Sequence, residues 1–241
     1  MQRLRVLVCI WAILVAGALP PMAQISREDH DLSAVEQAPW AAIGQITYGG
    51  PPGGAICTGA LVATDLVLTA GHCVAVNDVA MRAADIQFAA GWRAGASVAI
   101  RHGKEIILAE PTAGQPKSLS QDVALIVLDA PIDADVIHPL PLSRQDLLSE
   151  IYTLIGYRRD APDIMRRNEG CDLAATQPGV LQLGCPVVSG NSGAPVLAER
   201  KGIWQIAAVM AAAAGARSYA VIPGDDLRAR LPRIRAVHFR I

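Results

Sequence analysis

The sequence predicts an all-β protein that forms a sandwich or a barrel. Short runs rich in Val, Ile and Thr recur along the chain, and Gly, Pro, Asn and Asp separate them. Such runs between turn-forming residues are typical of antiparallel strands, and long helical periodicity is missing. The twelve predicted strands span residues 41–48, 55–63, 66–69, 86–90, 97–100, 105–108, 123–128, 151–156, 180–183, 195–198, 203–210 and 218–222.

Residues 1–23 have the layout of a secretory signal peptide. Two arginines precede the apolar run 6–19, and small residues allow cleavage after Ala18 or Ala23. The run is short for a membrane span, which needs about 20 residues, and an uncleaved membrane anchor is the alternative. We therefore expect an exported protein, periplasmic or extracellular, that is free of the membrane once the signal is cleaved.

A proline-rich, polar stretch over residues 131–150 separates the first seven predicted strands from the last five. It favours a crossover between two subdomains, which we place at residues 38–135 and 136–241. Residues 24–37, ahead of the first subdomain, form an N-terminal segment or a removable propeptide.

Two polar parts of the second subdomain have separate interpretations. Residues 225–231 favour a short helix that Asp225 or Asp226 would cap. Residues 157–169 carry four arginines and are interpreted as a solvated surface loop, with substrate steering as the alternative.

Charge bears on the possible partners of the protein, and chain length bears on the number of hydrophobic cores. The formal net charge is -1, and no basic patch with interleaved aromatic residues occurs, which argues against nucleic-acid binding. With 52% hydrophobic residues, the 241-residue chain is long enough for one large core or two small ones.

Four cysteines remain once Cys9 leaves with the signal peptide: Cys57, Cys73, Cys171 and Cys185. An even number in an oxidising compartment predicts two disulfides. Three pairings are open, and the two pairs that are local in sequence would each contribute about 3 kcal/mol by chain entropy. A zinc site is the alternative, although no C-x-x-C spacing is present.

Ser192 is a candidate nucleophile. In the stretch CPVVSGNSGAPV, Gly190 and Gly193 bracket Asn191 and Ser192 ahead of an apolar run. A serine hydroxyl attacks only when a base takes its proton, so the alternative is a plain turn between two strands.

His72 and Asp122 are the candidate base and orienting acid. Among the five histidines, only His72 follows an apolar strand and precedes a cysteine that a disulfide would hold, in LVLTAGHC. Asp122 opens the apolar run DVALIVL, which puts a carboxylate at the edge of a core strand, where it would fix the tautomer of the histidine. Taken singly, each residue is also compatible with a structural role.

Together the three contexts are more specific. TAGHC around His72, DVAL at Asp122 and SGNSG around Ser192 occur in the order His, Asp, Ser. In that order the sequence resembles the trypsin/chymotrypsin-like serine endopeptidases, most closely the exported bacterial type related to glutamyl endopeptidases, over roughly residues 39–231. The resemblance implies two perpendicular antiparallel β-barrels, a protein or peptide substrate and no cofactor, and we expect a monomer.

The resemblance also implies a role for each matched residue. His72 would act as general base and then as general acid, and Asp122 would hold its other ring nitrogen. Ser192 would attack the substrate carbonyl, and the backbone N–H groups of Gly190 and Ser192 would form the oxyanion hole.

The resemblance selects one cysteine pairing as well. Cys57–Cys73 matches the disulfide that braces the family's histidine loop, and Cys171–Cys185 resembles a bridge beside the substrate pocket. No metal site is expected, since the sequence has no clear carboxylate cluster for calcium.

The predicted substrate pocket departs from the trypsin pattern. Pro186 and Val187 occupy its floor, so a preference for Arg or Lys is not expected. Glutamyl specificity relies on a pocket histidine and a hydroxyl residue, and Val209 and Val187 take those places. The pocket residues are Pro186, Val187, Val209, Met210 and Ala211, which predict cleavage after small or medium apolar residues.

Three further positions differ from the family pattern. Asn191 replaces the aspartate that pairs with a freed N-terminus in animal trypsins, and no Ile-Val-Gly-Gly start is present, so activation of that type is not expected. No hydroxyl residue lies near Met210 to support Asp122, and Ala194 replaces a common glycine.

Two other function classes compete with a protease. An α/β-hydrolase would use Ser192 with Asp225 or Asp226 and His238, but its G-x-S-x-G motif fails at Ala194 and strand–helix alternation is absent. A protease-fold binding protein with little or no turnover is the other alternative, because a fold does not guarantee its function.

Overall fold

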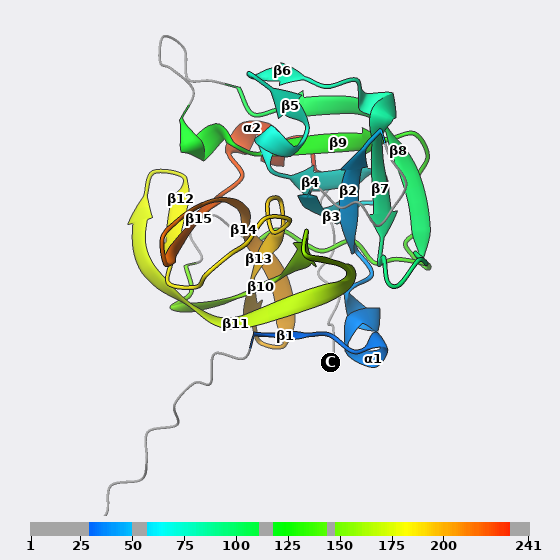
Figure 1. Ribbon diagram of the computed structural model, residues 1–241. Coiled ribbons are helices and arrows are strands. Elements are labelled where there is room, and N and C mark those ends of the chain that lie inside the picture. Colours follow the sequence, from blue (N-terminus) through cyan, green and yellow to red (C-terminus); the bar gives the residue numbers. More distant parts are fainter. Residues whose placement is uncertain (1–28, 50–56, 111–117, 144–147, 232–241) are drawn as a thin grey trace, which may run out of the picture.

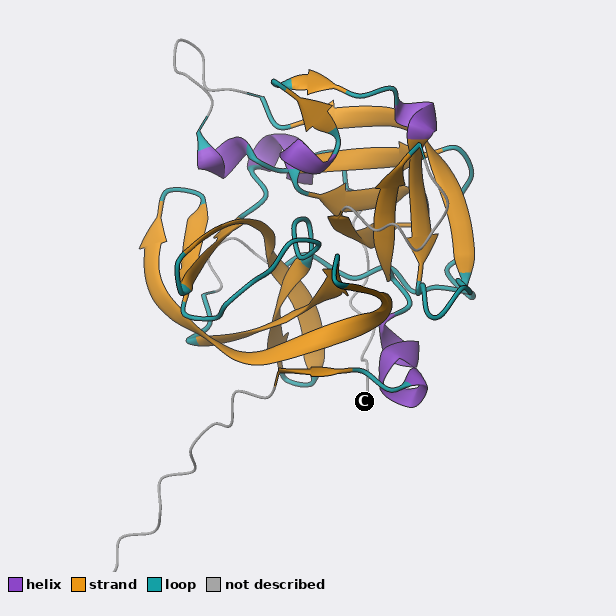
Figure 2. Cartoon of the chain, in the orientation of Figure 1, coloured by secondary structure: helices purple, strands orange, loops and turns teal. Residues whose placement is uncertain are grey.

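The computed structural model describes residues 29–49, 57–110, 118–143 and 148–231, and most of them lie in strands arranged as two lobes (Figures 1 and 2). The predicted signal peptide lies outside the described residues. Within the described part, no helix has the length and apolar character needed to cross a membrane.

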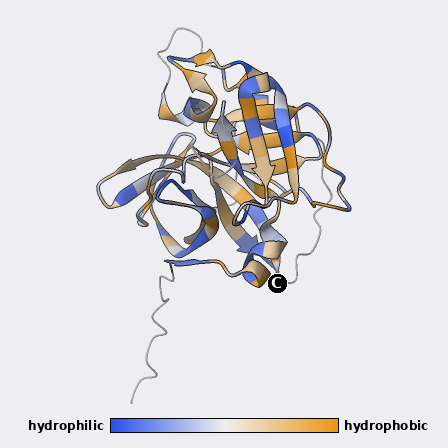
Figure 3. Ribbon diagram, turned by 45° about the vertical axis from the view of Figure 1, so that its right-hand side comes forward, coloured by the Kyte–Doolittle hydropathy of each residue, from blue (hydrophilic) through white to orange (hydrophobic). Residues whose placement is uncertain are grey.

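The first lobe is a closed barrel in which strands pair in the order β2-β3-β4-β9-β8-β7. The strands are β2 (Ile43–Tyr48), β3 (Cys57–Ala63), β4 (Leu66–Thr69), β7 (Ile86–Ala90), β8 (Ala99–Leu108) and β9 (Ala124–Leu128). All seven residues of β3 are buried, and apolar residues follow the strands of this lobe (Figure 3). Burial of this apolar surface is the main term that stabilises the lobe.

The second lobe is a sheet with strand order β1-β11-β10-β13-β14-β15-β12. The strands are β1 (Asp29–Asp31), β10 (Ile151–Arg158), β11 (Ala161–Gln177), β12 (Val180–Leu183), β13 (Pro195–Arg200), β14 (Ile203–Ala214) and β15 (Arg217–Val221). An additional pairing of β11 with β12 joins the ends of the sheet into a ring, and β1 lies on the outer edge of β11. The lobe therefore forms a second barrel with its own core.

Short elements complete the described chain. They are helix α1 (Ala34–Gln37), hairpin β5–β6 (Ala75–Val76 and Val79–Ala80), helix α2 (Asp225–Arg228) and four 3₁₀ turns, at Ala38–Trp40, Gly71–Cys73, Ala83–Asp85 and Leu119–Gln121. The predicted fold class, two antiparallel β-barrels with a short C-terminal helix, is confirmed.

Three local predictions were wrong. Residues 97–100 and 105–108 belong to one strand, β8, and the predicted loop over 157–169 consists of the end of β10 and the first half of β11. Helix α2 starts after Gly224 with no side-chain cap, so Asp225 and Asp226 lie in its first turn. The β11 error has a physical cause: backbone pairing with β1, β10 and β12 sets this strand, and arginines are accepted at its half-exposed positions.

Polar and aromatic contacts join the two barrels. The buried Tyr157 of β10 donates its hydroxyl to the Trp92 carbonyl of the first barrel at 2.7 Å, and burial raises the pKa of this phenol. Trp40 and Trp204 meet edge to face, with ring centroids 5.6 Å apart, and the Arg167 guanidinium lies over both rings. These contacts hold the barrels in a defined relation, on which any site between them depends.

Candidate active site

His72 lies on a 3₁₀ turn at the end of a buried strand. Strand β4 ends at Thr69, and the turn Gly71–Cys73 follows at once. A disulfide between Cys57 and Cys73 ties this turn to the start of β3. The His72 side chain is 45% exposed, so a rigid backbone presents an imidazole that solvent and substrate can reach.

Asp122 meets His72 through strand register. Strand β9 pairs with β4, with Thr69 opposite Ala124, and Asp122 lies just ahead of β9. One carboxylate oxygen lies 2.7 Å from His72 Nδ1, and the other accepts the His72 backbone N–H at 2.8 Å. A side chain at Gly71 would come within 3.0 Å of Asp122, so a glycine there lets the two approach.

Ser192 lies on the loop between β12 and β13, residues 184–194, which we call the Ser192 loop. The Ser192 carbonyl accepts the Thr58 N–H at 2.8 Å, one residue from the Cys57–Cys73 disulfide. Within the described residues, the Ser192 hydroxyl makes no hydrogen bond, including to His72. The structure thus brings His72 and Asp122 into contact and places Ser192 on the facing barrel. The hydrogen bond between a catalytic serine and its base is often long or absent when no substrate is bound.

Among residues 190–194, two backbone N–H groups have no backbone acceptor within the part of the chain that the structure describes. The N–H groups of Asn191, Gly193 and Ala194 donate to Val188, Met210 and Asn191, respectively. Those of Gly190 and Ser192 have no such partner. They are the two donors that the family resemblance implies for an oxyanion hole.

Asn191 holds the Ser192 loop with its side-chain amide. Its Oδ1 accepts the Val188 N–H at 2.9 Å, and its Nδ2 donates to the Tyr157 carbonyl at 3.0 Å. The residue is 7% exposed, so both bonds are shielded from water. The neutral amide of Asn191 thus links the loop to β10 through hydrogen bonds and needs no ion pair.

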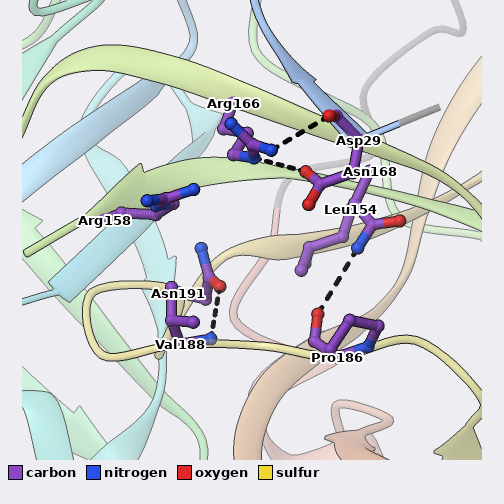
Figure 4. Close-up of a pocket in the computed structure, with 8 residues that line it drawn as sticks. All are labelled: Asp29, Leu154, Arg158, Arg166, Asn168, Pro186, Val188 and Asn191. Atoms are coloured by element: carbon purple, nitrogen blue, oxygen red, sulfur yellow. Dashed lines mark hydrogen bonds and ion pairs between the residues drawn. The ribbon is translucent and has the colours of Figure 1, made fainter. Parts of the chain in front are cut away.

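A cavity of about 60 Å³ lies beside Asn191 (Figure 4). Its lining consists of Asp29, Leu154, Arg158, Arg166, Asn168, Pro186, Val188 and Asn191. Carboxylates neutralise both arginines, since Arg166 pairs with Asp29 and Asp31, and Arg158 pairs with Asp160 at 2.6 Å. None of the three candidate catalytic residues lines the cavity, so it is not the expected site of peptide cleavage.

The predicted substrate-pocket residues differ in their placement. Val209, Met210 and Ala211 are buried in β14, and Val187 is half-buried against the core of the second barrel. The Met210 main chain contacts the residues after Ser192: its carbonyl accepts the Gly193 N–H at 2.7 Å. Pro186 is exposed and lines the cavity beside Asn191.

The four cysteines form two disulfides, and the first pair also belongs to the one group of potential metal ligands found among the described residues. Cys57 pairs with Cys73 and Cys171 with Cys185. The ligand atoms of Cys57, His72 and Cys73 lie within 4.8 Å of one another, but both sulfurs are bonded in the disulfide and are not free to bind a metal.

Sequence reasoning missed Thr58, Tyr157 and Arg159, which contact the Ser192 loop from other elements. Thr58 belongs to β3, and the other two lie at and beyond the end of β10. Each acts through contacts between segments that are distant in sequence. No local pattern marks such a residue.

Comparisons with known proteins identify the family and the fold. The family model described as Trypsin matches residues 30–221. A solved structure of a Glu endopeptidase is similar, with a TM-score of 0.68 and 20% identity, over 83% of this chain and 93% of that one. No curated protein matches the chain at a significant level. At this identity the structural likeness shows the fold, and the family model shows the family.

Proposed function

The chain belongs to the trypsin family of serine endopeptidases, and we propose that it cleaves peptide bonds through Ser192, His72 and Asp122. The observation that carries this proposal is the contact of His72 with both oxygens of Asp122, at 2.7 Å and 2.8 Å. A carboxylate that binds the main chain and the ring of one histidine fixes the orientation and tautomer of that ring.

The proposed reaction proceeds in two steps. His72 Nε2 takes the Ser192 hydroxyl proton as Ser192 Oγ attacks the substrate carbonyl, and it then gives this proton to the leaving amine. Water attacks the resulting acyl-enzyme in the same way, which frees Ser192. Asp122 stays ionised throughout and stabilises the imidazolium that forms in each step.

We assign the oxyanion hole to the N–H groups of Gly190 and Ser192. In a planar trans peptide the N–H points opposite to the preceding carbonyl. The Ser189 carbonyl accepts the Arg159 N–H at 2.8 Å, and the Asn191 carbonyl accepts the Ala194 N–H at 2.9 Å. The Gly190 N–H therefore points away from Arg159 and the Ser192 N–H away from Ala194, and these fixed orientations support the assignment.

For specificity, we propose cleavage after small or medium apolar residues. Val187, Val209, Met210 and Ala211 offer no charged or hydroxyl group. An acidic or basic substrate side chain would lose its hydration there without gaining a hydrogen bond. Burying it would therefore cost free energy, whereas burying an apolar side chain would not.

We further propose that the enzyme acts outside the cytoplasm, after removal of residues 1–23. Two disulfides support this location, since they persist mainly in oxidising compartments.

A fluorophosphonate probe tests the triad. The chain, expressed with export, should be labelled at Ser192, while Ser192→Ala should show no labelling and His72→Ala should lose most of it. A peptide library should then show cuts after apolar residues rather than after Glu, Arg or Lys. No labelling of a folded, disulfide-bonded wild type would instead favour a protease-fold binding protein.

A further inference from the structure

We propose that Thr58 is a positioning residue that holds the oxyanion hole in its active shape. The inference rests on the proposed function and adds a residue that the Ser-His-Asp triad does not include. Thr58 is fully buried in β3 of the first barrel, next to Cys57, whereas the hole that it would hold belongs to the second barrel.

Every polar group of Thr58 is engaged. Its N–H donates to the Ser192 carbonyl at 2.8 Å, and its hydroxyl donates to the Gly190 carbonyl at 2.8 Å. The same hydroxyl accepts the Tyr157 N–H at 3.0 Å, and the Thr58 carbonyl accepts the Thr69 hydroxyl at 2.9 Å. A hydroxyl that must accept from Tyr157 has its proton directed at Gly190, so the orientation of this hydrogen bond is set.

Thr58 completes the anchoring of four successive carbonyls. Arg159 and Ala194 hold the carbonyls of Ser189 and Asn191. Of the residues that the structure describes, Thr58 alone holds those of Gly190 and Ser192. Gly190 has a φ of +102°, which glycine adopts without strain, so the residue's own backbone preference does little to hold the peptide that follows it. The Gly190–Asn191 peptide lies between the two peptides that carry the N–H groups of the hole. Without the Thr58 hydroxyl this middle peptide would lose its anchor, and the spacing of the two donors would no longer be fixed.

The test compares three isosteric or conservative variants. Thr58→Val keeps the shape and the backbone N–H but removes the hydroxyl, while Thr58→Ser keeps the hydroxyl. Thr153→Val makes the same change at a buried threonine of β10 and is the matched control.

We expect kcat of Thr58→Val to fall about tenfold with KM nearly unchanged, which is less than the roughly 10²–10³-fold loss of a whole oxyanion donor. The affinity for a peptidyl boronate, which mimics the tetrahedral state, should fall by the same factor. Thr58→Ser should recover most of the rate, Thr153→Val should match wild type, and the pH profile should not move, since His72 is untouched.

The inference is overturned if Thr58→Val keeps the wild-type rate, or if Thr58→Ser is as slow as Thr58→Val. Amide hydrogen exchange gives a readout that needs no turnover: the Asn191 N–H, which belongs to the Gly190–Asn191 peptide and donates to Val188, should exchange faster in Thr58→Val than in the other two variants. If wild-type Ser192 does not react with the fluorophosphonate, the proposed function fails, and the exchange result still decides the role of Thr58.

Discussion

At the scale of single residues, Asn191 shows how this chain holds the Ser192 loop without a charged partner. Its buried amide needs one donor and one acceptor, and Val188 and Tyr157 supply them. An aspartate of the same shape would keep the bond from the Val188 N–H but would turn a carboxylate oxygen toward the Tyr157 carbonyl. Two acceptors would then face each other in a buried place.

We therefore predict that Asn191→Asp destabilises the fold at neutral pH by about 1–3 kcal/mol or more, the cost of an unsatisfied buried group. Burial should raise the pKa of the new carboxyl above its usual value of about 3.9. A raised carboxyl pKa costs stability above that pKa, so the deficit should shrink as the pH falls through it and the protonated group donates to Tyr157.

Urea unfolding at several pH values between about 4 and 7 measures this deficit, in a Ser192→Ala background that prevents self-cleavage. Asn191→Ala is the control, since its deficit contains no titrating group and should not depend on pH. An equal, pH-independent deficit in both variants would show that the side chain does not face the Tyr157 carbonyl.

At the scale of elements, the turn Gly71–Cys73 depends on its disulfide. Cys57–Cys73 spans 16 residues and Cys171–Cys185 spans 14, so chain entropy predicts a similar loss of about 3 kcal/mol when either pair is replaced by alanine. Only the first pair holds the turn that carries His72. We predict that the His72 Nδ1–H proton, shared with Asp122, broadens or disappears from the NMR spectrum of Cys57→Ala/Cys73→Ala.

The Cys171→Ala/Cys185→Ala variant is the matched control, because it loses comparable stability on the other barrel. Its His72 proton should remain sharp below the unfolding temperature. The same broadening in both variants would mean that global stability, rather than the local bridge, orders the histidine turn.

The elements also show what a sequence can reveal. Strand β4 and the start of β9 were predictable, since each is a buried apolar run with a polar residue beside it. His72 follows the end of β4, and Asp122 precedes the start of β9. Strand β11 was not predictable, because its partners are set by tertiary pairing and its arginines have no apolar alternation. For the same reason, Thr58 has no local signal: its partners in the second barrel lie about 100 residues or more away, at Tyr157, Gly190 and Ser192.

At the scale of the whole molecule, the candidate site lies where the two barrels touch, and Gly193 lies at that contact. A β-carbon at Gly193 would come within 2.1 Å of the Thr58 carbonyl oxygen and 2.2 Å of the Thr69 hydroxyl, both in the first barrel. These distances are well inside van der Waals contact. Any side chain there must push the Ser192 loop away from β3 and β4.

We predict that Gly193→Ala destabilises the protein through two separable effects. Its φ of +80° alone costs a residue with a β-carbon about 1–2 kcal/mol. Overpacking of the barrel contact should add about 1–3 kcal/mol or more. Because the strain moves the loop from Thr58, fluorophosphonate labelling of Ser192 should also be lost at temperatures where the variant is folded.

Gly202→Ala separates the two effects. Gly202 lies on the β13–β14 turn with nearly the same φ, +77°. Apart from its two chain neighbours, a β-carbon there would have no atom of the described residues within 4 Å. This variant should lose only the backbone contribution and keep full labelling. Urea unfolding of both variants gives the difference directly. Equal losses would mean that the barrels can separate at Gly193 without cost, and the Ser192 loop would then owe its position to the second barrel alone.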